Sequence, residues 1–493
     1  MKPPLSLSNG IKKEVNNLPD SLTLNGTRKE WLYLLRGRKE SPFAPRDHEL
    51  LQTPGMKGAR IVSTTFNLIR VDQPIGFTVK GEEHEQQLLD ELKTWILTEE
   101  DVEIEFDNVP GKTYVGRVTG EISNYARPAP TLRQGTLTFL CLPYKIKPEK
   151  TENITSEVFT VKGTDETEPI FELGVLAPIT FALVSNGDEY MMIGQPIDVS
   201  QTPEESETEV FYHGMESMVG WVSTDMVAEG YINGSMEFDS TGFSPVFDAP
   251  NPDVQEWHGP ALKHSLSSAV QNFKADMGFR FFAENIGGNV GRIEMYGLDS
   301  NNNIVFRAFI EDKWIGQDHF GVQLELEGGA VTDYLTLPKT LKDVYGRMKV
   351  IREGNQWTLI MQHLRTGVGR IVEKEWRRTI ESDQSTQEIS QIQLSFQKFY
   401  DTNEEDMKVL LMRCYQLNDV QGVPYIAQAG DEIIFDHRDD NEHDPEIRIN
   451  GELRNDLKDF GATPFKLKPG ERTLTALPDG DVQGVVRYRP RDQ

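Results

Sequence analysis

The sequence predicts a mainly β protein: an α+β N-terminal domain, followed by a β-sandwich that is interrupted by an inserted second β-sandwich. Segments in which apolar and polar residues alternate recur along the chain, and Asn-Gly, Pro-Gly or Gly-Asp turn signals separate them. This is the pattern of strands with one buried face. Residues 81–96 instead place apolar side chains at three- and four-residue steps, the period of an α-helix. The 493 residues suffice for about three domains.

The N-terminal domain is predicted to span residues 1–146. Glu82, Glu83 and Glu85 occupy the first turn of its helix, where exposed N–H groups favour negative charge. A helix that leads into strands with one dry face is typical of a small α+β unit. The expected helical face is Leu88, Leu89, Leu92, Trp95 and Ile96; strands are expected at 31–35, at 61–79 with a break near 72–74, and at 102–106, 114–118 and 136–142, with a Pro110-Gly111 turn and a loop at 127–130.

A second sandwich is predicted from two distant parts of the chain, residues 150–200 and 418–493. Residues 171–193 hold strands joined by a turn at 185–188, but this piece is too small to bury a core alone. Its partners are expected much later in the chain. These strands are predicted at 433–435, 447–449, 465–467 and 473–475, the last two joined by a Pro-Gly hairpin.

Residues 205–417 are predicted to be a self-contained β domain inserted between these two parts. Two hairpins are indicated by strand pairs that flank short polar turns. Domains accept insertions well where their own ends lie close together. The expected strands lie in 221–247 and at 273–282, 291–296, 304–309, 348–352, 357–361, 392–399 and 409–415.

Two sets of motifs resemble the distal tail proteins of siphophages. The string GTLTFLCLPY at 135–144 is similar to the ring-forming N-terminal domain of that family, and the strings GDEIIFD, IRINGE and FKLKPGERTLT, in this order between 430 and 475, resemble its galectin-like C-terminal domain. The resemblance implies a homohexameric hub that joins the tail-tube protein to a tail-associated hub or lysin protein. It also implies a place in the virion, at the tail tip or baseplate, after synthesis in the host bacterial cytoplasm.

The inserted domain resembles a laminin-G or concanavalin-like jelly roll, and its segment WHGPALKHSL at 257–266 is similar to segments of such modules in phage tail proteins. The resemblance implies a carbohydrate-binding module for host-wall polysaccharide. Sugar binding needs a flat aromatic face and polar groups that fix the hydroxyls. Trp257 with His258, and Trp314 with its neighbours Asp312 and Lys313, offer both. The alternative is that these tryptophans only fill the core or its rim.

A basic, proline-rich stretch from Arg36 to Gly58 is the candidate assembly arm. Arg36, Arg38, Arg46 and Lys57 concentrate positive charge there. In a ring, such an arm would reach the acidic neighbouring subunit, and its charge would steer docking. The alternative is a freely mobile basic loop.

The net charge of −27 argues against a nucleic-acid-binding surface, because such binding needs clustered Lys and Arg. The acidic surplus fits an ordinary acidic protein or, in a ring, a lumen that DNA passes without sticking. No apolar stretch reaches the length of a membrane span and no N-terminal signal is evident, so neither membrane insertion nor export is expected. Cys141 and Cys414 lie in apolar strand patterns, which predicts buried thiols rather than a disulfide.

An enzyme is not expected. The GxSxG, HExxH, Walker and paired CxxC motifs are absent. Glu294 and Asp299 could be a carboxylate pair for glycoside hydrolysis, but they fall on a strand and its hairpin turn. The acidic run from Asp436 to Asp444, which includes His437 and His443, lacks the central glycine and alternating ligands of a calcium loop. No metal and no other cofactor is therefore expected.

Three functions follow from these observations. The leading hypothesis is a structural hub of a phage tail tip with an outward saccharide-binding module. The second is a carbohydrate-binding adhesin without a role in ring assembly. The third is a wall glycosidase, for which the sequence shows no site.

Overall fold

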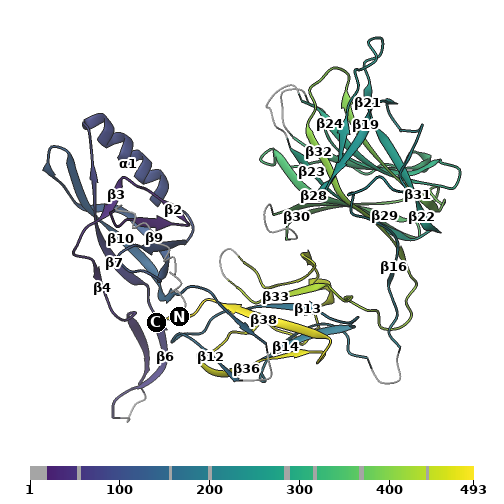
Figure 1. Ribbon diagram of the computed structural model, residues 1–493. Coiled ribbons are helices and arrows are strands. Elements are labelled where there is room, and N and C mark those ends of the chain that lie inside the picture. The colour runs from purple at the N-terminus through teal and green to yellow at the C-terminus, as the bar shows by residue number, and fades with distance from the viewer. Residues whose placement is uncertain are drawn as a thin grey trace, which may run out of the picture.

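The computed structural model describes residues 19–52, 57–154, 158–197, 202–282, 289–314, 319–365, 371–439 and 443–493. It confirms the predicted fold class: the protein is mainly β, with a helix in the N-terminal part and a sandwich interrupted by a second one. Figure 1 shows these parts as an N-terminal body with α1, a sandwich beside it, and an inserted sandwich reached through β16.

The N-terminal body is a sheet of order β2-β1-β8-β9-β10-β7-β3, with β4 beside β7 and the C-terminal β39 beside β10. α1 packs Leu88, Leu92 and Ile96 onto the core of this body. The bounds are β1 (Leu22–Leu24), β2 (Thr27–Arg28), β3 (Leu32–Leu34), β4 (Lys39–Glu40), β7 (Ile69–Thr78), α1 (Glu82–Ile96), β8 (Val102–Phe106), β9 (Thr113–Ala129), β10 (Leu132–Ile146) and β39 (Arg491–Asp492).

Two proline-containing segments form strand where the sequence indicated a break, so these two predictions are wrong. β9 continues through Pro128, and its register with β10 shifts repeatedly in this region, so the missing N–H falls where pairing is already irregular. In β7, Pro74 lies between the residues that pair with β3 and those that pair with β4. The missing N–H of Pro74 therefore falls at a position of β7 that pairs with neither β3 nor β4.

β5 (Arg46–Leu51) and β6 (Arg60–Phe66) form a two-stranded hairpin outside the sheet of the N-terminal body. β5 is exposed along its whole length, and β6 is exposed at every residue except the half-buried Phe66. Figure 1 shows this hairpin projecting away from the rest of its body. The predicted arm, Arg36 to Gly58, thus supplies β4 of the sheet and β5 of this hairpin, whereas β6 lies beyond its predicted end.

The split sandwich joins distant parts of the chain through β13, which lies between β33 and β38. Phe171 is paired with Phe435 on one side and with Val486 on the other, and all three are buried. The facing strands β14, β15 and β37 form a second layer. The bounds are β11 (Lys150–Asn153), β12 (Val158–Val161), β13 (Ile170–Val175), β14 (Phe181–Ser185), β15 (Tyr190–Gly194), β33 (Glu432–Asp436), β34 (Glu446–Ile449), β35 (Glu452–Leu453), η2 (Asn455–Leu457), β36 (Gly470–Thr473), β37 (Thr475–Leu477) and β38 (Val482–Tyr488).

The hairpin predicted between 465–467 and 473–475 does not form. Leu467 makes an isolated bridge with Thr167, whereas β36 pairs with β12. Gly470 has φ 102°, a conformation that suits glycine and turns the chain toward a different partner. Gly470 lies in a turn, as expected, but the segments before and after it pair with different parts of the chain.

The inserted sandwich, called the module below, packs two sheets over one core. Their orders are β17-β22-β31-β24-β25-β26-β27 and β19-β20-β32-β23-β28-β29-β30. The bounds are β16 (Glu207–His213), β17 (Val222–Ser223), β18 (Tyr231–Ile232), β19 (Ser235–Asp239), β20 (Gly242–Val246), β21 (Trp257–Gly259), β22 (Ala261–Val270), β23 (Phe273–Phe282), β24 (Gly291–Leu298), β25 (Ile304–Asp312), β26 (Gly321–Leu326), η1 (Glu327–Gly329), β27 (Leu335–Thr336), β28 (Asp343–Glu353), β29 (Gln356–Leu364), β30 (Val372–Glu381), β31 (Ile389–Phe399) and β32 (Asp406–Leu417).

The module begins and ends at adjacent strands, because Glu207 at the start of β16 pairs with Leu417 at the end of β32. Just outside it, the backbone N–H of Glu204 donates to Val423 O at 3.2 Å. Cys141 and Cys414 are buried free thiols, as predicted. Within the described residues, no helix is both long and apolar enough to cross a membrane.

His437 predicts a pH dependence for the split sandwich. It is 2% exposed, and its ring packs edge-on against Phe171 and Phe465. Burial lowers the pKa of His437 from 6.5 to about 4. Because the folded-state pKa is depressed, stability is full above the unfolded-state pKa and is lost as the pH falls from 6.5 toward 4, by about 3 kcal/mol in total.

Hydrogen-exchange mass spectrometry of peptides from β13 and β33 at several pH values measures this loss. The pH dependence should shrink in the His437→Gln variant and persist in His48→Gln, a control in the exposed hairpin. An unchanged pH dependence in His437→Gln would contradict the assignment.

Candidate functional site

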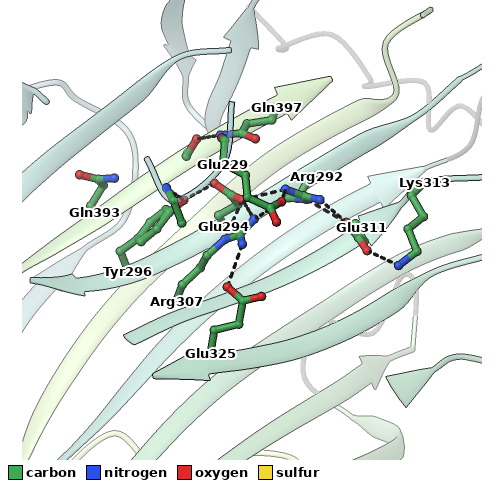
Figure 2. Close-up of polar contacts among 12 residues, drawn as sticks. Glu229, Arg292, Glu294, Tyr296, Arg307, Glu311, Lys313, Glu325, Gln393 and Gln397 are labelled. Carbon is green, nitrogen blue, oxygen red and sulfur yellow. Dashed lines mark hydrogen bonds and ion pairs between the residues drawn. The ribbon is translucent and has the colours of Figure 1, made fainter. Parts of the chain in front are cut away.

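The outer face of the module's first sheet carries an ordered array of polar side chains. On β24, Ile293 and Met295 enter the core, whereas Arg292, Glu294 and Tyr296 occupy the alternate positions. β25 and β31 contribute side chains to the same array (Figure 2). We call this array the polar cluster: Arg292, Glu294, Tyr296, Arg307, Glu311, Gln393 and Gln397, all less than 5% exposed.

Glu294 lies at the centre of the polar cluster. Its Oε1 accepts from Arg307 Nη2 at 2.6 Å and from Arg307 Nε at 3.0 Å, and it lies 3.4 Å from Arg292 Nη1. Its Oε2 accepts from the Tyr296 hydroxyl at 2.6 Å. A fully buried carboxylate is tolerated when guanidinium groups and a hydroxyl surround it in this way.

The ion pairs continue from Arg292 to one rim of the sheet. Arg292 Nη2 lies 2.6 Å from Glu311 Oε2. The other oxygen of Glu311 accepts from the Tyr334 hydroxyl at 2.9 Å and lies 3.0 Å from Lys313 Nζ. Lys313 is partly exposed, so the cluster reaches solvent on this side (Figure 2).

Residues 226–229, which we call the covering segment, lie over the cluster. Gln393 Nε2 donates to Met226 O at 2.8 Å, and Ala228 N donates to the Tyr296 hydroxyl at 3.3 Å. The Glu229 carboxylate lies 2.7 Å from Arg292 Nη1 and 3.3 Å from Arg307 Nη2. The segment therefore adds the Glu229 carboxylate to the three, Glu294, Glu311 and Glu325, that already pair with the two buried arginines.

The clear carboxyl pKa shifts in the cluster are opposite to the shift that a general acid for glycoside hydrolysis needs. Burial opposes ionisation of Glu311 and Glu229, but the neighbouring cations together outweigh it, Arg292 with Lys313 at Glu311 and Arg292 with Arg307 at Glu229, and the pKa of each carboxyl is lowered. Burial and the adjacent Glu294 raise the pKa of Tyr296 well above its usual value. Among the described Asp and Glu residues with a clear shift, every pKa is lowered. A retaining or inverting glycosidase needs one carboxyl with a raised pKa.

Trp257 and Trp314, two of the predicted sugar-binding residues, lie on either side of this network. The guanidinium of Arg292 stacks 4.0 Å from the Trp257 ring centroid, so one ring face of this half-buried tryptophan is covered. Trp314 is 50% exposed, stacks on His319, and lies 5.9 Å from Lys313 Nζ. Of the two rings, Trp314 is the accessible one.

His258 faces inward. Its Nδ1 is 2.8 Å from Asn233 Oδ1, its Nε2 is 2.8 Å from Tyr400 O, and it is fully buried. Asp299 caps its own hairpin turn, accepting from the backbone N–H groups of Asn301 and Asn303. Asp299 therefore holds the turn, while Glu294 belongs to the polar cluster.

The sequence reading missed Arg292, Arg307, Glu311, Gln393 and Gln397. The signal for Arg292, Gln393 and Gln397 was present in the strings RIEMY and QIQLSFQ, where polar residues take every second position in otherwise apolar strands. Arg307 and Glu311 lie in the string VFRAFIE, where Phe309 interrupts this alternation. Such a strand has two buried faces, one apolar and one polar. This alternation indicates a strand but does not by itself indicate a site.

The predicted arm residues lie in different environments. Arg38 pairs with Glu40 at 2.7 Å and stacks 4.1 Å from the Phe106 ring centroid, inside the N-terminal body. Arg46 begins the projecting hairpin and stacks on Phe66. Arg36 and Lys57 are exposed. Arg38 is thus a packing residue, whereas the other three lie on accessible surface.

The acidic run shows no metal-ligand group in the part of the chain that the structure describes. Asp436 pairs with Arg438, and His437 is bonded to Phe465 O at 3.1 Å. Asp440 and Glu442 lie outside the described residues.

Comparison with protein families gives one match, over residues 27–141, to the phage tail protein RIFT-related domain. Residues 27–141 are therefore similar to a phage tail domain, in agreement with the resemblance found in the sequence, and this match supports a place in the virion tail. No curated protein matches the chain.

Solved structures similar to the chain include two from phage tails. SPP1 Dit (gp 19.1), described as a paradigm of the hub adsorption apparatus in phages infecting Gram-positive bacteria, has 18% identity and a TM-score of 0.31, over 36% of this chain and 74% of that one. The CBM2 module of the evolved Dit of Lactobacillus casei BL23 phage J-1 has 15% identity and a TM-score of 0.38, over 44% and 99%. A prokaryotic β-1,3-1,4-glucanase (lichenase) derived from a mouse hindgut metagenome has 9% identity and a TM-score of 0.29, over 42% and 98%.

The polar cluster predicts a large cost for removing one of its charges. Arg307→Met leaves Glu294 buried with one of its two arginines gone, which should destabilise the module by about 3–5 kcal/mol. Denaturant unfolding followed by tryptophan fluorescence measures this, because Trp357 lies in the module core.

The matched control is Arg365→Met, which removes an exposed pair with Glu373 and should cost less than about 1 kcal/mol. Equal stability of the two variants would show that the cluster does not hold the module together.

Proposed function

We propose that this phage tail protein is the hub of the tail tip: a homohexameric ring between the tail-tube protein and a tail-associated hub or lysin protein, with the module outward to bind host-wall saccharide. The observation that carries the proposal is the similarity of residues 27–141 to a phage tail domain, joined in one chain to a split sandwich and an inserted two-sheet sandwich. The domain boundaries we propose are 1–146, 150–200, 205–417 and 418–493.

The projecting β5–β6 hairpin supports the ring. Leu50, Leu51, Ile61 and Val62 are each 54–61% exposed on it. An isolated two-stranded hairpin is marginally stable in water, and clustered exposed apolar residues mark interaction sites. A neighbouring copy would cover these side chains, and the basic Arg46 would meet an acidic surface. Closed rings are built from such unlike patches on adjacent subunits.

The ring proposal predicts loss of assembly when charge enters the hairpin. Leu50 and Ile61 are cross-strand partners, so the double variant Leu50→Glu/Ile61→Glu places two carboxylates side by side in the contact. Size-exclusion chromatography with light scattering should show hexamers for the parent chain and monomers for this variant.

Val331→Glu is the control, since Val331 is 50% exposed but lies on the module. A parent chain that stays monomeric at all concentrations would contradict the ring. If that monomer still bound wall polysaccharide, the adhesin function would be the better description.

Trp314 and Lys313 support saccharide binding at the module rim. Trp314 offers an accessible ring face beside a cation and next to the buried carboxylate Glu311. An aromatic face that packs on sugar C–H groups, with charged groups that fix hydroxyls, is the composition of a sugar site. Every described carboxyl with a clear pKa shift is shifted downward, so we propose that this rim binds saccharide without hydrolysing it.

The rim proposal predicts that Trp314→Ala weakens binding to purified wall polysaccharide about tenfold, the value of an aromatic contact of about 1.4 kcal/mol. Biolayer interferometry with immobilised polysaccharide measures the change. Phe238→Ala, which removes another aromatic that is 50% exposed on the module, should bind normally. Undiminished binding by Trp314→Ala would exclude the rim as the site.

A further inference from the structure

A cleft of about 1020 Å³ lies between the module and the split sandwich. Its floor is the outer face of the module's second sheet, from β16, β32, β23 and β28, and its wall comes from residues 424–431 and the β34–β35 region of the sandwich. Interfaces between domains are frequent ligand sites. This cleft is on the opposite sheet of the module from the polar cluster and the Trp314 rim.

Four side chains form a row across the floor of the cleft. Tyr212 is paired with Arg413, Arg413 with Asp276, and Asp276 with Lys349, on four successive strands. Directly opposite residues on antiparallel strands project to the same side of the sheet. The row therefore presents a ring, a guanidinium, a carboxylate and an ammonium to the cleft in one line.

Ion pairs fix the positions of the side chains in the row and connect the floor of the cleft to its wall. Asp276 Oδ2 accepts from Arg413 Nη2 at 2.7 Å and lies 3.4 Å from Arg347 Nη2. Arg347 Nη1 in turn lies 3.4 Å from Glu452 of the sandwich, which also pairs with Lys349. The floor is thus rigidly positioned, with its charges compensated.

Two polar atoms in this network have no protein partner. Asp276 is 2% exposed, yet its Oδ1 accepts no hydrogen bond, and Nε of the adjacent Arg413 donates none. Leaving a buried polar atom unpaired costs about 1–3 kcal/mol. Both atoms are closed to a water-sized group in the free protein. A ligand hydroxyl, which both donates and accepts hydrogen bonds, therefore pairs with them only when the side chains above them move aside.

Space and an aromatic face are present beside these atoms. Tyr212 is 59% exposed at the end of the row. Gly278, which also lines the floor, leaves room: a Cβ built on it would meet only Leu411 Cβ, at 3.6 Å. Because Tyr212 and Asp276 lie two strands apart, one sugar unit of an oligosaccharide can pack on Tyr212 while the next extends across Arg413 toward Asp276.

We propose that this cleft is a second saccharide-binding site, in which a hydroxyl-rich oligosaccharide donates to Asp276 Oδ1, accepts from Arg413 Nε and packs on Tyr212. The inference rests on the proposed saccharide binding of the module but places a ligand at a different surface. Two sites on opposite sheets would let one module hold two stretches of a wall polymer, and simultaneous binding raises the overall affinity.

Calorimetry with the full chain tests the proposal. The probe is the oligosaccharide that the parent chain binds most tightly on an array of bacterial wall oligosaccharides. The parent should bind two per chain. Gly278→Leu, which fills the cleft floor beside its cross-strand neighbour Arg347, and Trp314→Ala should each bind one, and the double variant none. Tyr212→Ala should weaken the cleft site about tenfold, and Phe238→Ala should keep both sites.

The outcomes separate the two proposals. One oligosaccharide per parent chain, lost in Trp314→Ala and unaffected by Gly278→Leu and Tyr212→Ala, overturns the cleft and leaves the rim. If the parent binds one oligosaccharide and this binding is lost in Gly278→Leu but kept in Trp314→Ala, the result supports the cleft site and overturns the rim site. No binding by the parent overturns both saccharide sites and leaves the ring to its own test. If Gly278→Leu fails to fold, as judged by tryptophan fluorescence, Tyr212→Ala decides.

Discussion

The pairing of β13 with both β33 and β38 is the constraint on which the architecture depends. It joins residues 170–175 to residues 432–436 and 482–488. The sandwich therefore forms only when the parts of the chain before and after the module are both present. Closing so long a segment costs little extra entropy, because the cost grows only with the logarithm of loop length. The folded module reduces it further, since its first and last strands are neighbours.

The pairing of β13 with β33 also helps to fix the position of the module relative to the split sandwich. Glu452 follows β34, which pairs with β33, and its carboxylate meets Lys349 and Arg347 of the module. Arg448 Nη1 also donates to Val372 O of the module at 2.9 Å. The sandwich therefore supplies contacts as well as an attachment point, and these contacts create the cleft.

Buried ion pairs recur on both sheets of the module, around Glu294 and around Asp276. Breaking such a pair costs far more than forming it gains, so these networks specify geometry more than they add stability. They keep charged side chains at set positions on surfaces from which a ligand can approach. The hairpin β5–β6 shows the opposite arrangement, apolar groups left in water, which suits a contact completed by another subunit.

Local patterns in the sequence determined the elements, and tertiary pairing decided the sites. The helical face around Leu88 and Leu92 and the strands β8 and β24 follow from residue periods and turn signals, which are properties of neighbours in the chain. The interrupted order of the sandwich was implied instead by the resemblance of its motifs to the galectin-like domain of distal tail proteins. The partners of Glu294, the inward turn of His258 against Tyr400, and the row from Tyr212 to Lys349 do not, because they depend on register between strands far apart in sequence. The strands through Pro74 and Pro128 also could not be predicted from the local sequence, because a missing N–H breaks a strand only if the neighbouring strand needs that donor.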